Sequence, residues 1–264
     1  MSDGVLYFLT SKGRKVKKVK YTRLAVRSAE SVKAQMPYLQ TTIFTDFNIK
    51  KYECFDNVFH VEKRFKDIWV YKYDCLLKSP YERTLHLDAD TYMCDKIPEV
   101  FQALDRFDLV TTLSPHYGLG REPQKVARCF PEIAGGFLAW KKNAKMEKLW
   151  TDMKRLVPTR PKFRADEPVL RKVLYESDVR YAIIPWEYHC IYLTPGYLWS
   201  KVKVMHGKDI GTNEDIVAAA KIMNENKNWR VFSGETLFQL RKAGRSKKRI
   251  KFDKAIHYGF YEKE

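Results

Sequence analysis

Residues 83–90 of the chain are RTLHLDAD. The run Leu85-His86-Leu87 predicts a buried strand, and that strand delivers two carboxylates separated by one residue. In an open α/β sheet, ligands bind beyond the carboxyl ends of the strands. Asp88 and Asp90 would offer there the hard oxygen ligands that Mg²⁺ and Mn²⁺ prefer. A lone D-x-D pair is more often a turn, because Asp is common in turns.

Strand-like and helix-like segments alternate on both sides of this stretch. Short apolar or β-branched runs predict strands at residues 5–10, 41–46, 58–61, 83–90, 108–112, 135–140, 181–184 and 202–205. Apolar residues at helical spacing predict helices at residues 21–35, 68–78, 146–156 and 166–175, and again beyond residue 212. This rhythm indicates an α/β fold with a mostly parallel sheet flanked by helices. No linker or repeat divides the chain, so we expect a single domain over residues 1–264.

The composition excludes intrinsic disorder as a description of the whole chain. Of the 264 residues, 45% are hydrophobic and 14% aromatic, which is enough apolar surface to form a core. No run approaches the roughly 20 apolar residues of a membrane span, and the N-terminus has no signal-peptide pattern. The cysteines are odd in number and form no C-x-x-C pair, which argues against disulfides and zinc. We therefore expect a soluble protein of the cytoplasm, which would be the host cytoplasm if the protein is viral.

Four further segments of the sequence occur in the same order as the motifs of one enzyme family. They are Thr45-Asp46, FPEIAGGF at residues 130–137, DEPVL at 166–170 and HGK at 206–208. Together with Asp88-Ala89-Asp90 they resemble the GT-A fold nucleotide-sugar glycosyltransferases, and in particular the layout of glycosyltransferase family 8. The resemblance spans about residues 5–208. It implies a Rossmann-like GT-A sheet and metal-dependent transfer of a hexose or pentose from a nucleoside-diphosphate sugar, with a UDP-sugar as the expected donor.

The resemblance also implies roles for individual residues. Asp88, Asp90 and His206 would hold Mn²⁺ or Mg²⁺ at the donor diphosphate. Asp166 and Glu167 would recognise the sugar or act as a general base, although an acidic pair also suits the start of a helix for electrostatic reasons alone. The residues expected to bind the donor are Thr10, Ser11, Lys72, Asp88, Ala89, Gly135, Gly136 and Lys208. The nucleotide-sugar half would cover about residues 1–115, and the half that closes the acceptor and metal side about residues 116–264.

Two departures from the family pattern concern the sugar and acceptor side of the site. Ala134 stands where many relatives have Asn, and Glu167 stands where many have Gln. They leave the sugar and the stereochemical outcome open, while the family 8 layout favours retention. Among the other histidines, His86 shows no partner pattern, and we interpret His189 as structural.

The net charge of +17 predicts a polyanionic partner. Phosphate backbones are attracted to cationic tracks, and enzymes that act on a base in DNA also need aromatic surfaces for the extruded nucleotide. Candidate aromatic residues are Trp186, Tyr188, Tyr192, Tyr197 and Trp199. The candidate nucleic-acid-binding residues are Lys12, Arg14, Lys15, Lys17, Lys18, Arg160, Arg164, Lys247 and Lys248. We expect the acceptor to be the hydroxymethyl group of a modified pyrimidine in DNA, such as 5-hydroxymethylcytosine, as in bacteriophage DNA glycosylation.

Two alternatives to this acceptor stay open. In the first alternative, the acceptor is a cell-envelope or lipid-linked glycan, and the same lysine and arginine side chains hold the protein on an anionic membrane surface. In the second, the chain is a non-enzymatic nucleic-acid-binding domain, and its paired carboxylates are turn residues. Charge runs are also often no more than solvated faces.

Overall fold

The computed structural model describes residues 2–10, 18–47, 53–61, 67–114, 126–159, 166–191, 196–207, 215–225 and 230–232. It divides the chain into two compact units. The first comprises Met1–Ala89 and Ile97–Ile184, and the second comprises Asp90–Lys96 and Pro185–Glu264. That the chain forms a single domain stays a prediction.

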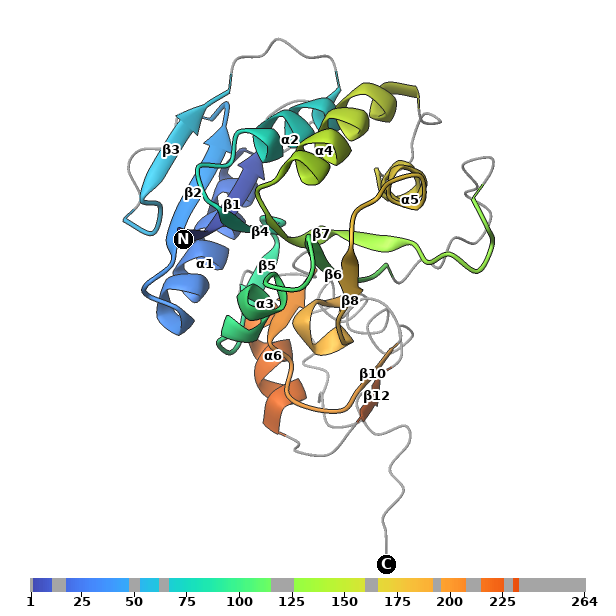
Figure 1. Ribbon diagram of the computed structural model, residues 1–264. Coiled ribbons are helices and arrows are strands. Elements are labelled where there is room, and N and C mark those ends of the chain that lie inside the picture. Colours follow the sequence, from blue (N-terminus) through green and yellow to red (C-terminus); the bar gives the residue numbers. More distant parts are fainter. Residues whose placement is uncertain are drawn as a thin grey trace, which may run out of the picture. The chain divides into compact units, whose positions relative to one another are not determined.

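The first unit is built on a seven-stranded sheet with the strand order β3-β2-β1-β4-β7-β6-β8 (Figure 1). Its strands are β1 (Asp3–Leu9), β2 (Gln40–Thr45), β3 (Asn57–His60), β4 (Arg83–Leu87), β6 (Leu109–Leu113), β7 (Ile133–Lys141) and β8 (Tyr181–Ile183). All neighbouring strands pair in parallel except β7, which runs antiparallel to both β4 and β6. The mostly parallel sheet predicted from the sequence is therefore confirmed.

Helices cover both faces of this sheet (Figure 1). They are α1 (Lys18–Gln35) on one face, and α2 (Ile68–Leu77), α4 (Ala144–Leu156) and α5 (Glu167–Tyr175) on the other; α3 (Pro98–Ala103) and the short 3-10 helix η1 (Val157–Thr159) complete the unit. Leu6 of β1 belongs to the core formed with α2, α4 and α5. The next residue, Tyr7, meets α1, where the Ser28 hydroxyl donates a hydrogen bond to the Tyr7 hydroxyl at 3.1 Å. The two side chains diverge because successive residues of a strand point to opposite faces.

Helices α2 and α4 bury their side chains in different ways. Helix α4 is amphipathic, with its buried residues at the helical spacing predicted from the sequence: Met146, Leu149, Trp150 and Met153. Helix α2 is buried from Val70 to Leu76, and this stretch includes the charged residues Lys72 and Asp74. Charged groups that leave water need partners inside the protein. We therefore expect Lys72 and Asp74 to form ion pairs with other residues.

Gly4 of β1 lies against the buried ring of Tyr81. A Cβ atom at residue 4 would come within 2.4 Å of the Tyr81 ring, and the Tyr81 hydroxyl is held by Thr42 at 2.6 Å. We expect Gly4→Ala to lower the free energy of unfolding by about 2–3 kcal/mol, as overpacking of a closed core does. Urea denaturation measures this change. If overpacking is the cause, Gly4→Ala costs less in a Tyr81→Leu background, and an equal cost in both backgrounds would contradict this explanation.

The second unit contains a three-stranded sheet with the order β5-β11-β9. Strand β11 (Val204–His206) pairs antiparallel with β5 (Thr91–Met93) and parallel with β9 (Cys190–Ile191). Helix α6 (Asp215–Glu225) packs on this sheet through Ile216, and η2 (Trp186–Tyr188) precedes β9. Strand β10 (Gly196–Leu198) pairs with β12 (Arg230–Phe232). The predicted strand at residues 202–205 corresponds to β11, displaced toward His206.

Within the residues that the structure describes, no helix has the length and apolar composition that a membrane-spanning helix needs. The structure describes all five cysteines and pairs none of them in a disulfide, and Cys54, Cys75 and Cys190 are buried.

Candidate functional site

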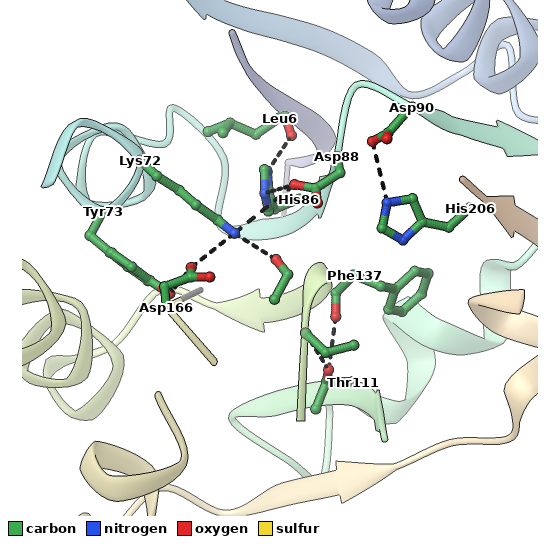
Figure 2. A network of polar contacts seen from close by, with 12 residues as sticks. Leu6, Lys72, Tyr73, His86, Asp88, Asp90, Thr111, Phe137, Asp166 and His206 are labelled. Carbon is green, nitrogen blue, oxygen red and sulfur yellow. Dashed lines mark hydrogen bonds and ion pairs between the residues drawn. The ribbon is translucent and has the colours of Figure 1, made fainter. Parts of the chain in front are cut away.

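Asp88 lies immediately beyond the last residue of β4 (Figure 2). Its backbone N–H donates to the Gly136 carbonyl at 3.0 Å, which extends the pairing of β4 with β7 by one residue. Its side chain is 37% exposed, and Oδ1 lies 3.4 Å from His86 Nε2 and 4.0 Å from Lys72 Nζ. The His86 ring is held from the other side, where Nδ1 lies 3.0 Å from the Leu6 carbonyl. No sequence pattern predicts this position of His86 beside Asp88, the first carboxylate of the D-x-D pair.

Lys72 is a buried cation at the same edge of the sheet. Its Nζ donates to the Gly135 carbonyl at 2.8 Å and forms an ion pair with Asp166 Oδ2 at 3.2 Å. Burial by itself would lower the pKa of Lys72, but the carboxylates of Asp166 and Asp88 raise it, and the net result is a pKa above the ordinary value. Lys72 therefore keeps its positive charge although its side chain is almost fully buried.

Asp166 is buried and directed at α2 (Figure 2). Its Oδ2 accepts a second hydrogen bond, from the Tyr73 hydroxyl at 2.6 Å. Burial, followed by the charge of Asp166, raises the pKa of Tyr73 well above its ordinary value, so the phenol remains a donor. Although Asp166 precedes α5, its side chain makes no capping hydrogen bond there. The ion pair with Lys72, rather than the helix start, accounts for the position of this carboxylate.

Gly135 lies against the Lys72–Asp166 ion pair. A Cβ atom at residue 135 would come within 3.3 Å of Lys72 Nζ and 3.4 Å of Asp166 Oδ1. The space left by the missing side chain is therefore bordered by the protein's own charged groups, and the expectation that it also admits a sugar stays a prediction. The Gly135 backbone also forms a hydrogen bond with the Glu167 carboxylate.

Glu167 is half-buried at the first residue of α5. Burial, and then the nearby carboxylates of Asp166 and Glu132, raise the pKa of Glu167 to about 7. At neutral pH this carboxyl group is therefore divided between its protonated and ionised forms. A group in that state can both accept and donate a proton.

The raised pKa of Glu167 predicts a pH-dependent effect on stability. The folded protein holds this proton up to about pH 7, whereas the ordinary value is 4.5. Stability therefore falls as the pH rises between these values, and the penalty is complete above pH 7. We expect Glu167→Gln to raise the free energy of unfolding at pH 8 by about 1–2 kcal/mol, reduced by partial exposure, and to change it little at pH 4.

Urea unfolding at pH 4, 6 and 8 measures this effect. Glu176→Gln, at the exposed other end of α5, is the matched control and should show no such pH dependence. Identical pH profiles for the parent protein and Glu167→Gln would contradict the assignment.

The second unit brings Asp90 and His206 together (Figure 2). Asp90 precedes β5, and His206 ends β11 opposite Thr91. His206 Nε2 lies 3.3 Å from Asp90 Oδ1, and their side chains are 16% and 14% exposed. Gly207 donates its N–H to the Asp90 carbonyl at 3.0 Å and has a φ of 157°, which residues with a side chain rarely adopt. This backbone conformation therefore explains why a glycine follows His206.

Several residues predicted for the site lie elsewhere or outside the described residues. Thr10 and Ala89 are described and largely buried. Lys18 begins α1, but its side chain is not among the described ones. Trp199 is 70% exposed, whereas Trp186 packs against the core of the second unit. The predicted residues outside the described part of the chain are Ser11, Lys12, Arg14, Lys15, Lys17, Arg160, Arg164, Tyr192, Lys208, Lys247 and Lys248.

The fold matches that of a known enzyme. Among solved structures, an active-site mutant of LgtC, a family 8 glycosyltransferase with the GT-A fold, matches with a TM-score of 0.56 and 12% sequence identity. The match covers 84% of this chain and 94% of the LgtC chain. The predicted GT-A fold is therefore confirmed. No protein-family model matches the sequence, and no curated protein matches it.

Proposed function

We propose that this protein is a metal-dependent glycosyltransferase that moves a sugar from a nucleoside-diphosphate sugar to a hydroxyl acceptor. The observation that carries the proposal is the pairing of His206 with Asp90, the second aspartate of the D-x-D motif that follows β4 in a GT-A fold. A strand-ending turn would explain the two aspartates alone, but it would not explain a histidine brought to Asp90 from β11.

The proposed ligands of Mn²⁺ or Mg²⁺ are Asp88, Asp90 and His206. Asp90 and His206 already face each other within one unit, and only Ala89 separates Asp90 from Asp88. Carboxylate oxygens with an imidazole nitrogen form a donor set that suits Mn²⁺. When bound, the cation would neutralise charge on the donor diphosphate and on the departing nucleoside diphosphate.

The Lys72–Asp166 ion pair is proposed to bind the donor sugar. Asp166 Oδ2 is occupied by Lys72 and Tyr73, so the carboxylate is fixed, and Oδ1 would accept a hydrogen bond from a sugar hydroxyl. Glu167 would exchange a proton with the sugar or the acceptor near neutral pH. Thr10, Ser11, Ala89, Gly135, Gly136 and Lys208 complete the proposed donor site, with UDP as the expected nucleotide.

The distribution of charge supports a polyanionic acceptor. The described residues contain equal numbers of acidic and basic side chains, so the whole net charge of +17 belongs to the segments between and after them. Residues 11–17, 48–52 and 62–66 follow β1, β2 and β3, which are parallel, and residues 160–165 precede Asp166. These four segments contain 12 basic residues and one acidic residue. Strands β1, β2 and β3 run parallel to β4 and therefore end at the same sheet edge as β4, which Asp88 follows, and a basic segment of the sequence comes after each of these three strands.

We infer that the acceptor is a hydroxymethylated pyrimidine in DNA, as in bacteriophage DNA modification, and that the enzyme works in the cytoplasm where that DNA is made. The test is mass spectrometry of nucleosides after incubation of DNA containing 5-hydroxymethylcytosine with the protein, Mn²⁺ and a panel of nucleotide sugars. A hexose- or pentose-sized mass gain is expected on this DNA only, and not with EDTA or with Asp90→Ala.

Other results of the same experiment favour the alternatives. If DNA stays unmodified while a nucleotide sugar is hydrolysed with Mn²⁺, the donor site stands and the acceptor becomes an envelope or lipid-linked glycan. Salt-sensitive binding to anionic vesicles in preference to DNA would support that alternative. Salt-sensitive DNA binding without any metal-dependent nucleotide-sugar binding would support a non-enzymatic nucleic-acid-binding domain.

A further inference from the structure

His189 is a buried histidine that neither the D-x-D pattern nor the proposed chemistry uses. It is 2% exposed and lies between η2 and β9, where its backbone N–H donates to the Trp186 carbonyl at 3.0 Å. Its ring stacks on the ring of His206, with centroids 4.6 Å apart and ring planes 27° apart. Both residues belong to the second unit.

The strand register explains why these two rings meet. In the parallel pairing of β9 with β11, His206 lies opposite Ile191. His189 directly precedes β9 and is two residues before Ile191. The pairing of β9 with β11 therefore brings His189 close to His206, and the two rings stack.

The stack restrains the torsion angle that turns the imidazole ring of His206 about its bond to the side chain. Rotation about the bond to the imidazole ring is broad for histidine, so β11 alone does not fix where Nε2 points. His189 covers a face of the ring, while the edge that carries Nε2 faces Asp90 at 3.3 Å. Stacking uses the face of an imidazole ring and leaves its nitrogens, which lie on the edge, available to a ligand.

We propose that His189 is a positioning residue that holds the His206 ring with Nε2 turned toward Asp90, and so sets the affinity of this site for a divalent cation. This inference rests on the proposed metal site. A ligand must be held within a narrow range of angles to be effective, and the residues that orient metal-binding histidines typically change metal affinity about 10–100-fold.

The experiment is a titration of the full chain with Mn²⁺, in which free Mn²⁺ is followed by electron paramagnetic resonance. The variants are His189→Phe, which keeps a flat ring, and His189→Leu, which fills similar space without one. His189→Leu should bind Mn²⁺ about 10–100-fold more weakly than the parent, and His189→Phe within about threefold of it. Thermal unfolding in EDTA shows that both variants are folded.

The outcomes separate this inference from the proposed function. Parental Mn²⁺ affinity in His189→Leu, or an equal loss in His189→Leu and His189→Phe, would overturn the positioning role alone. If the parent itself binds no more Mn²⁺ than Asp90→Ala, the metal site is wrong, and the inference fails with it. Rescue by the phenylalanine variant is the result that a general packing defect would not produce.

Discussion

Asp90→Asn should reduce Mn²⁺-dependent sugar transfer by about 10³-fold or more while leaving the protein folded. The substitution removes the negative charge that faces His206 but keeps the size of the side chain and the backbone hydrogen bond from Gly207. If Asp90 holds the cation at the diphosphate, its loss removes several kcal/mol of charge stabilisation, and each 1.36 kcal/mol is about tenfold in rate. Initial rates of nucleoside-diphosphate release measure the effect.

The matched control for Asp90→Asn is Asp95→Asn in the same unit. Asp95 pairs with Lys203 at 2.6 Å and is 39% exposed, so its loss should change turnover little and stability by less than about 1 kcal/mol. Retention of more than about a tenth of the parental Mn²⁺-dependent rate by Asp90→Asn would contradict a role as metal ligand.

Lys72→Met should lower the free energy of unfolding by about 3–5 kcal/mol. Lys72 and Asp166 are both almost fully buried, and removal of the lysine leaves the Asp166 carboxylate with the hydrogen bond from the Tyr73 hydroxyl but without the cation that lies 3.2 Å from it. Breaking one side of a buried ion pair costs this much because an uncompensated charge stays in a poorly solvating interior. Urea denaturation at neutral pH measures the loss.

A second substitution distinguishes the ion pair from simple packing. Asp166→Asn in the Lys72→Met background removes the stranded charge and should recover a large part of the lost stability. Lys154→Met is the control, because Lys154 is one-third exposed and its partner Asp74 keeps a second lysine, Lys78. A cost for Lys72→Met no larger than that of the control would show that the pair does not organise this edge of the sheet.

Strong local patterns made much of the first unit predictable. The strand at β4 follows from a short apolar run with carboxylates at its end, and α4 follows from apolar residues at helical spacing. The three residues of β5 are too few to form a pattern and become a strand only through pairing with β11. The predicted start of β11 lies before the observed one for a related reason, since its short run has no turn residue to mark its boundary.

Sequence motifs point to the candidate metal ligands, but not to the contacts among the buried residues nearby. Asp88, Asp90 and His206 stand in ordered motifs, whereas the partnership of Lys72 with Asp166 joins α2 to the start of α5 and exists only in the folded chain. One signal could have pointed to it: α2 is apolar on all sides, so a lysine within it had to be buried with a partner. No comparable signal exists for Tyr73 or His189, because aromatic side chains in an apolar setting normally belong to the core.

Release of nucleoside diphosphate from a panel of nucleotide sugars measures whether the protein uses a nucleotide sugar in a metal-dependent way. The assay compares the parent protein with Mn²⁺, the parent with EDTA, and Asp88→Ala and Asp90→Ala with Mn²⁺. We expect the parent with Mn²⁺ to release nucleoside diphosphate from at least one donor, and the other three samples to lose that release. A folded parent protein that neither binds nor cleaves any nucleotide sugar in the presence of Mn²⁺ would contradict it.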